Sequence, residues 1–481
     1  MKRHLCVILF VNFYLLGISQ VYNELNYKLE SVVSYGKGRH NAFWLISNHY
    51  GKGSLEKKSA YLNITVNYPG KINENLSYKF GLDIVGAYNH TANFFVHQAY
   101  GEVIYRNMLV TIGSKEYAMA LKNPLLSSGG MTFSTNARPI PQVKIGTEDY
   151  ITLWSGTPWF QLKGHVAYGR FTDDNFQKSF AEGKSKYNRG VLYHSKALFM
   201  KFEGQRVPLV FEGGLEMEAQ FGGRIYNKNG EITSKIPSRF IDFLKVLIPM
   251  SGDEETTGAD QVNVYGNHLG SWHASLAYAK ERYRIRFYYE HFFEDHSQMF
   301  WQYGFWKDGL VGVEVGLLDF NWINGFVYEY IGTKDQTGPF LHDETDRIPD
   351  QISGNDNYYN HCSYSSWSHW GMGLGNPLIF SPVYNVNGDL SFRSNRMKAH
   401  HIGIKGQIFD VGYRVLFSHA RHWGTYHNPL REVEINMHGM GEISYSPFKW
   451  KNWAFIFALG VDKSKLLGKN GSGMLTIRFS K

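Results

Sequence analysis

The sequence has very little cysteine. Its 481 residues include only Cys6 and Cys362, and Cys6 falls in an N-terminal segment that we expect to be removed. A mature chain with a single cysteine forms no intramolecular disulfide, which excludes the small disulfide-stabilised domains of secreted eukaryotic proteins. Together with the export signal described next, this favours a bacterial envelope protein.

Long apolar runs are also missing after the N-terminus. No later stretch approaches the roughly 20 consecutive apolar residues of a membrane-spanning helix. At the N-terminus, the basic pair Lys2–Arg3 precedes the apolar segment Leu5–Leu16, and the small residues Gly17 and Ser19 follow it. This order is typical of a secretory signal peptide, so we predict that residues 1–19 are cleaved on export.

Motifs of catalysis, cofactor binding and metal binding are absent as well. The 20 histidines form no HExxH or HxH motif, and neither CxxC, GxSxG, a Walker A motif nor GxGxxG occurs. The adjacent His400 and His401 would point to opposite faces of a strand, so they would not bind one metal ion together. We therefore expect a protein that is not an enzyme and that uses no cofactor and no metal.

Alternating apolar and polar residues characterise the segment Pro208–Phe221, PLVFEGGLEMEAQF. Because successive side chains of a strand point to opposite faces, the segment predicts a strand with one apolar and one acidic face. It is longer than the strands of about 5–6 residues found in globular proteins, and it suits a tilted membrane crossing of about 9–11 residues. A long sandwich strand with one wet face is the alternative.

The acidic face of this segment carries Glu212, Glu216 and Glu218. We interpret these glutamates as charges that face the lumen of a barrel, opposite basic residues such as Arg284 and Arg286. Carboxylates two positions apart on a strand lie roughly 7 Å from each other, so a glycosidase pair is the alternative. The structural role is preferred.

Similar alternating segments recur along the chain, roughly fifteen or more of them. Examples are Leu62–Tyr68, Tyr283–Tyr289 and the C-terminal Leu475–Phe479. We therefore predict an all-β fold, a single large antiparallel transmembrane β-barrel built from residues 20–481, in which closure removes exposed strand edges. A periplasmic multi-sheet or propeller fold is the alternative, although no repeat of about 40–50 residues is present.

Two segments depart from the alternation and predict short helices inside the barrel domain. One lies near residues 40–50, where Phe43–Ile46 is apolar. The other lies near residues 237–249, where apolar residues recur at helical spacing and Pro237 and Pro249 delimit the segment. We expect helices that plug or cover the barrel, and a partner-binding role is the alternative for the second.

One long stretch between strands, Asn355–Pro382, is unusually aromatic. Aromatic rings among amide and hydroxyl groups can stack on sugar rings and bind their hydroxyl groups. A loop folded on the barrel with its aromatic side chains buried is the alternative, and the two are compatible. The candidate glycan-binding residues are Tyr358, Tyr359, Tyr364, Trp367, His369 and Trp370.

Six segments in order make the sequence resemble the capsule assembly Wzi family, in particular its Bacteroidetes-type members. The segments are Arg39–Gly51, Ser134–Gln142, Gly266–Leu276, Glu329–Pro339, Gly354–His361 and Ser366–Leu378. The resemblance implies an outer-membrane barrel of about 18 strands, occluded by helices on the periplasmic side and by loops. It also implies a non-enzymatic, lectin-like role in which capsular polysaccharide is held at the cell surface.

We therefore expect an outer-membrane protein that binds capsular or other surface polysaccharide and helps to assemble or anchor the capsule. The expected partners are that polysaccharide and outer-membrane lipid, with the protein as a monomer. Nucleic acid is not expected, because the formal net charge of +8 is modest for this length and no basic cluster is present. An outer-membrane pore for a small solute or oligosaccharide is the alternative, and a membrane-embedded hydrolase is a third hypothesis.

Overall fold

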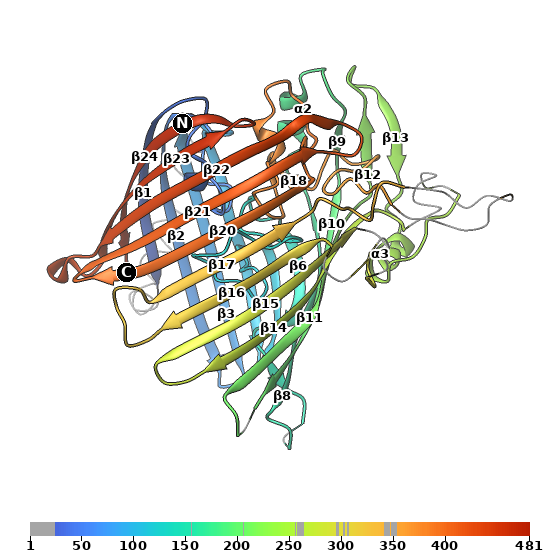
Figure 1. Ribbon diagram of the computed structural model, residues 1–481. Helices are drawn as coiled ribbons and strands as arrows, with labels where there is room; N and C mark the ends of the chain where they lie inside the picture. The colour runs from blue at the N-terminus through green and yellow to red at the C-terminus, as the bar shows by residue number, and fades with distance from the viewer. Residues whose placement is uncertain are drawn as a thin grey trace, which may run out of the picture.

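Long antiparallel strands form one large barrel in the computed structural model (Figure 1). The structure describes residues 25–154, 156–204, 206–254, 256, 264–294, 298–301, 304, 307–340, 347 and 354–481. The predicted signal peptide, residues 1–19, lies outside the described residues. No described helix is both long and apolar enough to cross a membrane.

The strands of the barrel wall follow one another in chain order. They are β1 (Asn26–Lys37), β2 (Lys58–Asn73), β3 (Leu76–Tyr88), β4 (Phe94–Tyr105), β5 (Met108–Ser114), β6 (Gln142–Thr147), β7 (Ile151–Thr152), β8 (Phe160–Arg170), β10 (Leu192–Glu203), β11 (Leu209–Phe221), β14 (Asn267–Ala279), β15 (Tyr283–Glu294), β16 (Gly309–Leu317), β17 (Gly325–Gly332), β20 (Met397–Ile408), β21 (Val411–Gly424), β22 (Pro429–Tyr445), β23 (Trp453–Ser464) and β24 (Gly468–Ser480).

The barrel closes where β24 pairs with β1, in a register that runs from Lys28 opposite Ser480 to Lys37 opposite Gly471. The two-residue β7 continues β6 along the same edge of β8, so the closed wall has 18 strands. Closure pairs the first and last strands of the described wall with each other, as a barrel in lipid requires. The prediction of an all-β transmembrane barrel of about 18 strands is thereby confirmed.

Apolar side chains face outward and polar ones inward along the wall. In β3, Phe80 and Leu82 are 55% and 46% exposed on the outer face, whereas Asp83 points inward and is buried. In β11, Phe211 is exposed on the outer face and Glu218 is buried on the inner one. This alternation gives the outer wall the apolar surface that a bilayer requires.

The two ends of the barrel differ in the length of the connections between their strands. Four turns at the end where β1 begins and β24 ends span only residues 74–75, 106–107, 280–282 and 409–410. The long connections 38–57, 115–141, 171–191, 222–266 and 333–396 all lie at the opposite end. Because membrane barrels have short periplasmic turns and long extracellular loops, the end with the long connections is the extracellular one.

The remaining elements belong to these long connections, and Figure 1 shows them gathered at one end. They are η2 (Phe43–Leu45), α2 (Asp174–Ala181), β9 (Tyr187–Arg189), β12 (Gly223–Tyr226), β13 (Ile232–Ile236), α3 (Phe240–Leu247), β18 (Ser368–His369), β19 (Met372–Gly373) and η3 (Pro382–Tyr384). Only η4 (Phe448–Trp450) lies at the other end among the described helical segments. The helices implied on the periplasmic side are therefore found on the extracellular side instead.

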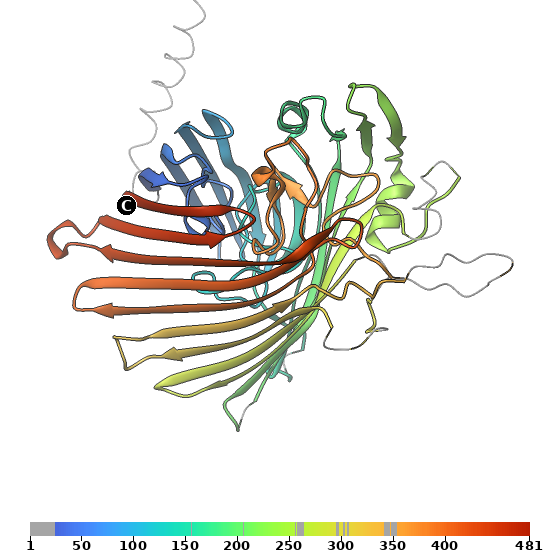
Figure 2. The same cartoon turned by 45° about the horizontal axis from the view of Figure 1, so that its top comes forward.

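Three of the long connections fold back into the lumen and form a plug, which we define as residues 38–57, 115–141 and 354–396. Figure 2 shows these segments crossing the mouth of the barrel. Their buried side chains, including Trp44, Leu126 and Trp367, form one apolar cluster with inward-facing residues of the wall. The helix predicted near residues 40–50 is only the three-residue η2, buried in this cluster.

Candidate functional site

A buried carboxylate of the wall, Glu329 of β17, holds one plug segment in place. It accepts hydrogen bonds from Ser127 Oγ at 2.6 Å, from Ser128 N at 2.7 Å and from Ser128 Oγ at 2.5 Å. A fourth donor is the hydroxyl of Tyr288 on β15, at 2.7 Å. Hydrogen bonds to a charged acceptor are the strong ones, so Glu329 is a principal anchor between the plug and the wall.

A second carboxylate, Glu290 of β15, anchors the same plug segment a few residues away. It accepts a hydrogen bond from Met131 N at 2.7 Å and pairs with Lys122 Nζ at 2.9 Å. Both charged side chains of this pair are essentially inaccessible to water. Because a buried charge is costly without its partner, the two anchors fix residues 122–131 firmly within the lumen.

The candidate aromatic residues lie in the plug, and most of them are buried. Tyr358, Tyr359, Tyr364, Trp367 and His369 are each at most 1% exposed, whereas Trp370 is half-buried.

Hydrogen bonds join these buried side chains to distant parts of the fold. Tyr358 donates to Asp308 at 3.0 Å, and Trp367 Nε1 donates to the carbonyl oxygen of Thr132 at 3.0 Å. Five of the six candidates therefore hold the plug together, and Trp370 alone presents its ring at the surface.

Trp370 lies beside a buried arginine at the extracellular mouth. The guanidinium carbon of Arg138 is 4.6 Å from the centre of the Trp370 ring and 3.7 Å from that of Phe95. The centre of the Phe176 ring, from α2, is 5.7 Å from that of the Trp370 ring, and the backbone N–H of Trp370 donates to Asp173 Oδ2 at 3.0 Å. We call Arg138, Phe176 and Trp370 the mouth site.

The charge of Arg138 is not neutralised by an acid. Its Nη2 donates to Thr91 Oγ1 at 2.7 Å, and no ion pair with a carboxylate forms within the described residues. Burial lowers the pKa of Arg138 to about 10, so the guanidinium stays protonated at neutral pH. The mouth site therefore combines aromatic rings with a positive charge, which suits a sugar ring that carries an acidic group.

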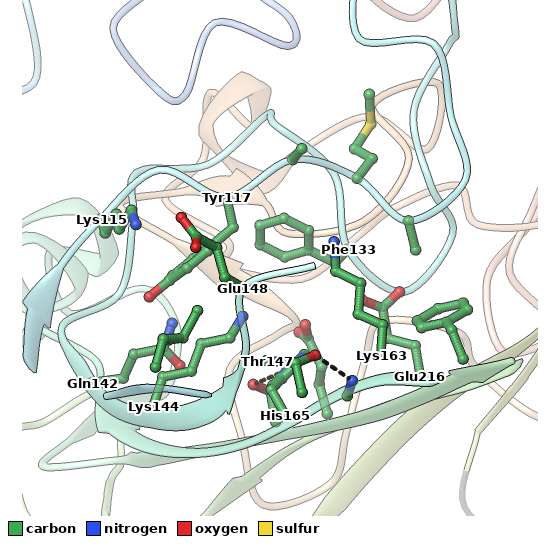
Figure 3. A pocket seen from close by; sticks show the side chains of 18 of the residues that line it. Lys115, Tyr117, Phe133, Gln142, Lys144, Thr147, Glu148, Lys163, His165 and Glu216 are labelled. Atoms are coloured by element: carbon green, nitrogen blue, oxygen red, sulfur yellow. Dashed lines mark hydrogen bonds between the residues drawn. The ribbon is translucent and has the colours of Figure 1, made fainter. Parts of the chain in front are cut away.

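A cavity lies inside the lumen, between the plug and the periplasmic end. This cavity has a volume of 460 Å³, and Figure 3 shows Tyr117, Lys144 and Glu148 around it. Its charged lining residues are Lys79, Lys115, Lys144, Lys163, Glu102, Glu148, Glu212, Glu216 and Glu218. With cations and anions side by side, the cavity resembles the polar interior of a barrel more than a site for one charge sign.

The predicted lumen charges lie where the strand pattern placed them, on the inner wall. All three glutamates of β11 line the cavity, whereas Arg286 forms its ion pair with Glu314 of β16. Arg284 is exposed near the periplasmic end of β15. The basic residues that share the cavity with the glutamates are therefore lysines, including Lys144 and Lys163.

One group of side chains has metal-ligand geometry. Ligand atoms of Asp83, His97 and Glu116 lie within 4.8 Å of one another. Lys52 Nζ is 3.0 Å from Glu116 Oε1, and His97 Nε2 is 2.8 Å from the same oxygen. Because the ammonium group already supplies a positive charge, the cluster fits an ion-pair network that ties the plug to the wall.

Acid is expected to loosen the plug through His369. Its Nε2 accepts a hydrogen bond from Thr172 N and its Nδ1 donates to the Arg138 carbonyl oxygen, so the neutral ring is the form that fits. Burial lowers the pKa of His369 to about 4, compared with about 6.5 in an unfolded chain. The unfolded state then gains protons first, so stability is fully present above pH 6.5 and falls by about 3 kcal/mol as the pH drops to 4.

Thermal unfolding between pH 4 and pH 7 measures this effect. His369→Asn keeps a side chain that can donate and accept hydrogen bonds but removes the titration. The difference in melting temperature between wild type and variant should therefore shrink as the pH falls. A difference that is the same at pH 4 and pH 7 would contradict the assignment.

Comparisons with known proteins found a matching family and several similar solved structures. The family description capsule assembly protein Wzi matches residues 40–377, and no curated protein matches the sequence. Among similar solved structures, Pseudomonas aeruginosa OccK5 (OpdH) has a TM-score of 0.48 and 8% identity, covering 95% of this chain and 98% of that one. Acinetobacter baumannii OccAB4 has a TM-score of 0.46 and 10% identity, covering 95% and 98%. Because the family match spans more than half of its length, the chain belongs to the Wzi family of capsule assembly proteins, and it is a β-barrel of the bacterial outer membrane.

Proposed function

We propose that this protein is a non-enzymatic lectin of the outer membrane that binds capsular or other surface polysaccharide and helps to anchor it at the cell. The observation that carries the proposal is the mouth site, where the half-buried ring of Trp370 lies 4.6 Å from the unpaired guanidinium of Arg138. A ring of this kind stacks on the apolar face of a sugar. The arginine beneath it favours a glycan that carries carboxylate or phosphate groups.

The anchored plug supports a binding role over the alternative of a transport pore. One plug segment, residues 122–131, is bound by Glu290 of β15 and Glu329 of β17, which lie on either side of β16 in the wall. A solute pathway would require these buried charge-assisted hydrogen bonds to break. We infer that the plug serves as the rigid support on which the mouth site is built.

The six aromatic and histidine candidates then divide into two roles. Trp370 contacts the glycan, because its ring is the accessible one. The other five residues are buried in the plug and position Trp370 without touching the glycan. They are Tyr358, Tyr359, Tyr364, Trp367 and His369. The rigid support reduces the conformational entropy that binding would otherwise cost.

Replacing Trp370 by alanine is expected to weaken polysaccharide binding about fivefold, because loss of one stacked ring removes about 1 kcal/mol. The melting temperature should hardly change, since the ring is only half-buried. Affinity electrophoresis in a gel that contains the cell's own surface polysaccharide measures the binding.

Trp450→Ala is the matched control, because Trp450 is 60% exposed in η4 at the opposite end of the barrel. Trp370→Phe retains an aromatic ring and should keep most of the affinity. If Trp370→Ala migrates like the wild type, the mouth site is not the binding site.

A further inference from the structure

The helix α3 exposes large apolar side chains on the side that faces away from the barrel. Asp242 and Lys245 are buried, whereas Phe240 is 81% exposed and Leu244 is 41% exposed. Ile241 is exposed beside them on the same surface. A helix with its charges inside and its large apolar side chains outside is expected where the surroundings are apolar.

Specific contacts hold α3 against the outer surface of the barrel, as Figure 1 shows beside β11. Lys196 of β10 points outward and donates to the carbonyl oxygens of Val246 and Leu247 at 2.8 and 2.6 Å, which satisfies the last turn of the helix. Tyr168 of β8 donates to the carbonyl oxygen of Phe243 at 2.8 Å. These bonds fix the orientation of the helix, so its outward face is a permanent feature of the surface.

The buried charges of α3 have partners of their own. Asp242 pairs with Arg239 at 3.1 Å, and Lys245 Nζ lies 2.7 Å from Asp253. The Phe243 ring packs on Phe221 of β11 with its centre 5.0 Å away. The charged and aromatic side chains of the inner face thus have partners within the protein. The helix can therefore keep this face toward the barrel and its other apolar side chains outward.

The outward face of α3 continues the lipid-facing surface of the wall. Tyr168, which contacts the helix, is paired with Val143 of β6, and Val143 is paired with Ile112 of β5. At the same level of the barrel, Val143 and Ile112 are therefore on the outer face, where they are 46% and 59% exposed. The neighbouring wall is thus apolar at the height of the helix.

An apolar groove extends this surface beside the helix. It has a volume of 720 Å³, and its lining includes Val166, Lys196, Leu198 and Met217. Lys196 also holds the end of α3, so the groove and the helix are contiguous. A groove of this kind on the outer wall offers space for an acyl chain.

We propose that α3 is an interfacial membrane helix, whose outward side chains and adjoining groove bind the acyl chains of the outer-leaflet lipid. The helix would thereby anchor the long connection 222–266 at the membrane surface. This inference does not depend on polysaccharide binding. It assigns a lipid-contacting role to a segment for which the sequence predicted a helix that plugs or covers the barrel.

Spin labelling tests the proposal on the protein without residues 1–19, which contain Cys6, in vesicles of phosphatidylcholine and lipopolysaccharide. Cys362, an exposed free cysteine, is first changed to serine, and a label is then attached through Leu244→Cys. Val143→Cys supplies a lipid-facing control on the wall. Lys228→Cys, in the exposed turn between β12 and β13, supplies a water-facing control.

Accessibility of each label to oxygen, which concentrates in hydrocarbon, is compared with accessibility to a water-soluble nickel chelate. The label at position 244 should behave like the label at position 143, with an oxygen-to-nickel ratio several-fold above that at position 228. A ratio equal to that at position 228 would place the helix in water and overturn the proposal. Exclusion of both reagents would mean that protein covers the helix, and this would overturn it too.

Discussion

Replacing Glu329 by alanine is expected to detach the plug from the wall and to let ions pass through the lumen. Four donors, from Ser127, Ser128 and Tyr288, converge on this carboxylate. Each hydrogen bond to a charged acceptor contributes about 1.5–3 kcal/mol, and buried donors that lose it stay unsatisfied. Because these contributions are not additive, we expect a total loss of about 3–5 kcal/mol in stability of the docked plug.

Conductance across planar lipid bilayers detects the detached state. The wild-type protein should give no steady current, whereas Glu329→Ala should give fluctuating openings. Glu30→Ala is the control, because Glu30 is also buried, and within the described part of the chain its hydrogen bonds come from Arg478 and Tyr61 of the wall. If the two variants are equally closed and equally stable, the wall is not held to the plug through Glu329.

Replacing Trp367 by alanine is expected to destabilise the plug and to weaken polysaccharide binding at the same time. The side chain is fully buried, and substitution of such a tryptophan by alanine costs about 3–5 kcal/mol through lost contacts and the cavity that remains. The carbonyl oxygen of Thr132 also loses its hydrogen bond. Because Trp370 follows three residues later in the same segment, its position should become less defined.

Thermal unfolding and affinity electrophoresis, measured on the same preparation, separate this effect from loss of direct contact. Trp367→Ala should lower both the melting temperature and the affinity, whereas Trp370→Ala should lower the affinity alone. Trp367→Phe fills most of the volume and should recover most of both. Unchanged affinity in a destabilised Trp367→Ala protein would show that the plug does not position the binding surface.

The barrel wall follows from the sequence because its physical cause is local. Side chains alternate between lipid and lumen with a period of two residues, so strands such as β3 and β11 are recognisable from their own residues. The short strands β5 and β6 carry less of this pattern, since seven and six residues give few alternations. Closure and the order of strands then follow from the need to pair every edge in a membrane.

The plug does not follow from the sequence in the same way. Burial of Tyr358 and Trp367 depends on contacts with residues far away in the chain, such as Asp308 and Thr132. Its anchors are single inward positions on strands, and an isolated glutamate such as Glu329 looks no different in sequence from any other lumen charge. Arg138 was likewise not identifiable, because nothing local indicates that a guanidinium will be buried without an acidic partner.

In the helix α3, the surroundings determine which way the apolar face points. Helical spacing near residues 237–249 correctly predicts a helix, and the structure places it at Phe240–Leu247. The same spacing does not say whether the apolar face meets protein or lipid. In water the face would turn inward, whereas on the outer wall of a membrane barrel it remains exposed.

The central claim, that this protein holds surface polysaccharide, is tested most directly with purified protein in detergent and the polysaccharide extracted from its own cells. Affinity electrophoresis with increasing salt, and with an unrelated neutral glycan for comparison, measures specific retention. We expect retention by the cell's own polysaccharide that weakens as salt rises, because Arg138 contributes a screened charge. Absence of retention, together with steady conductance in bilayers, would contradict the account and identify the protein as a pore.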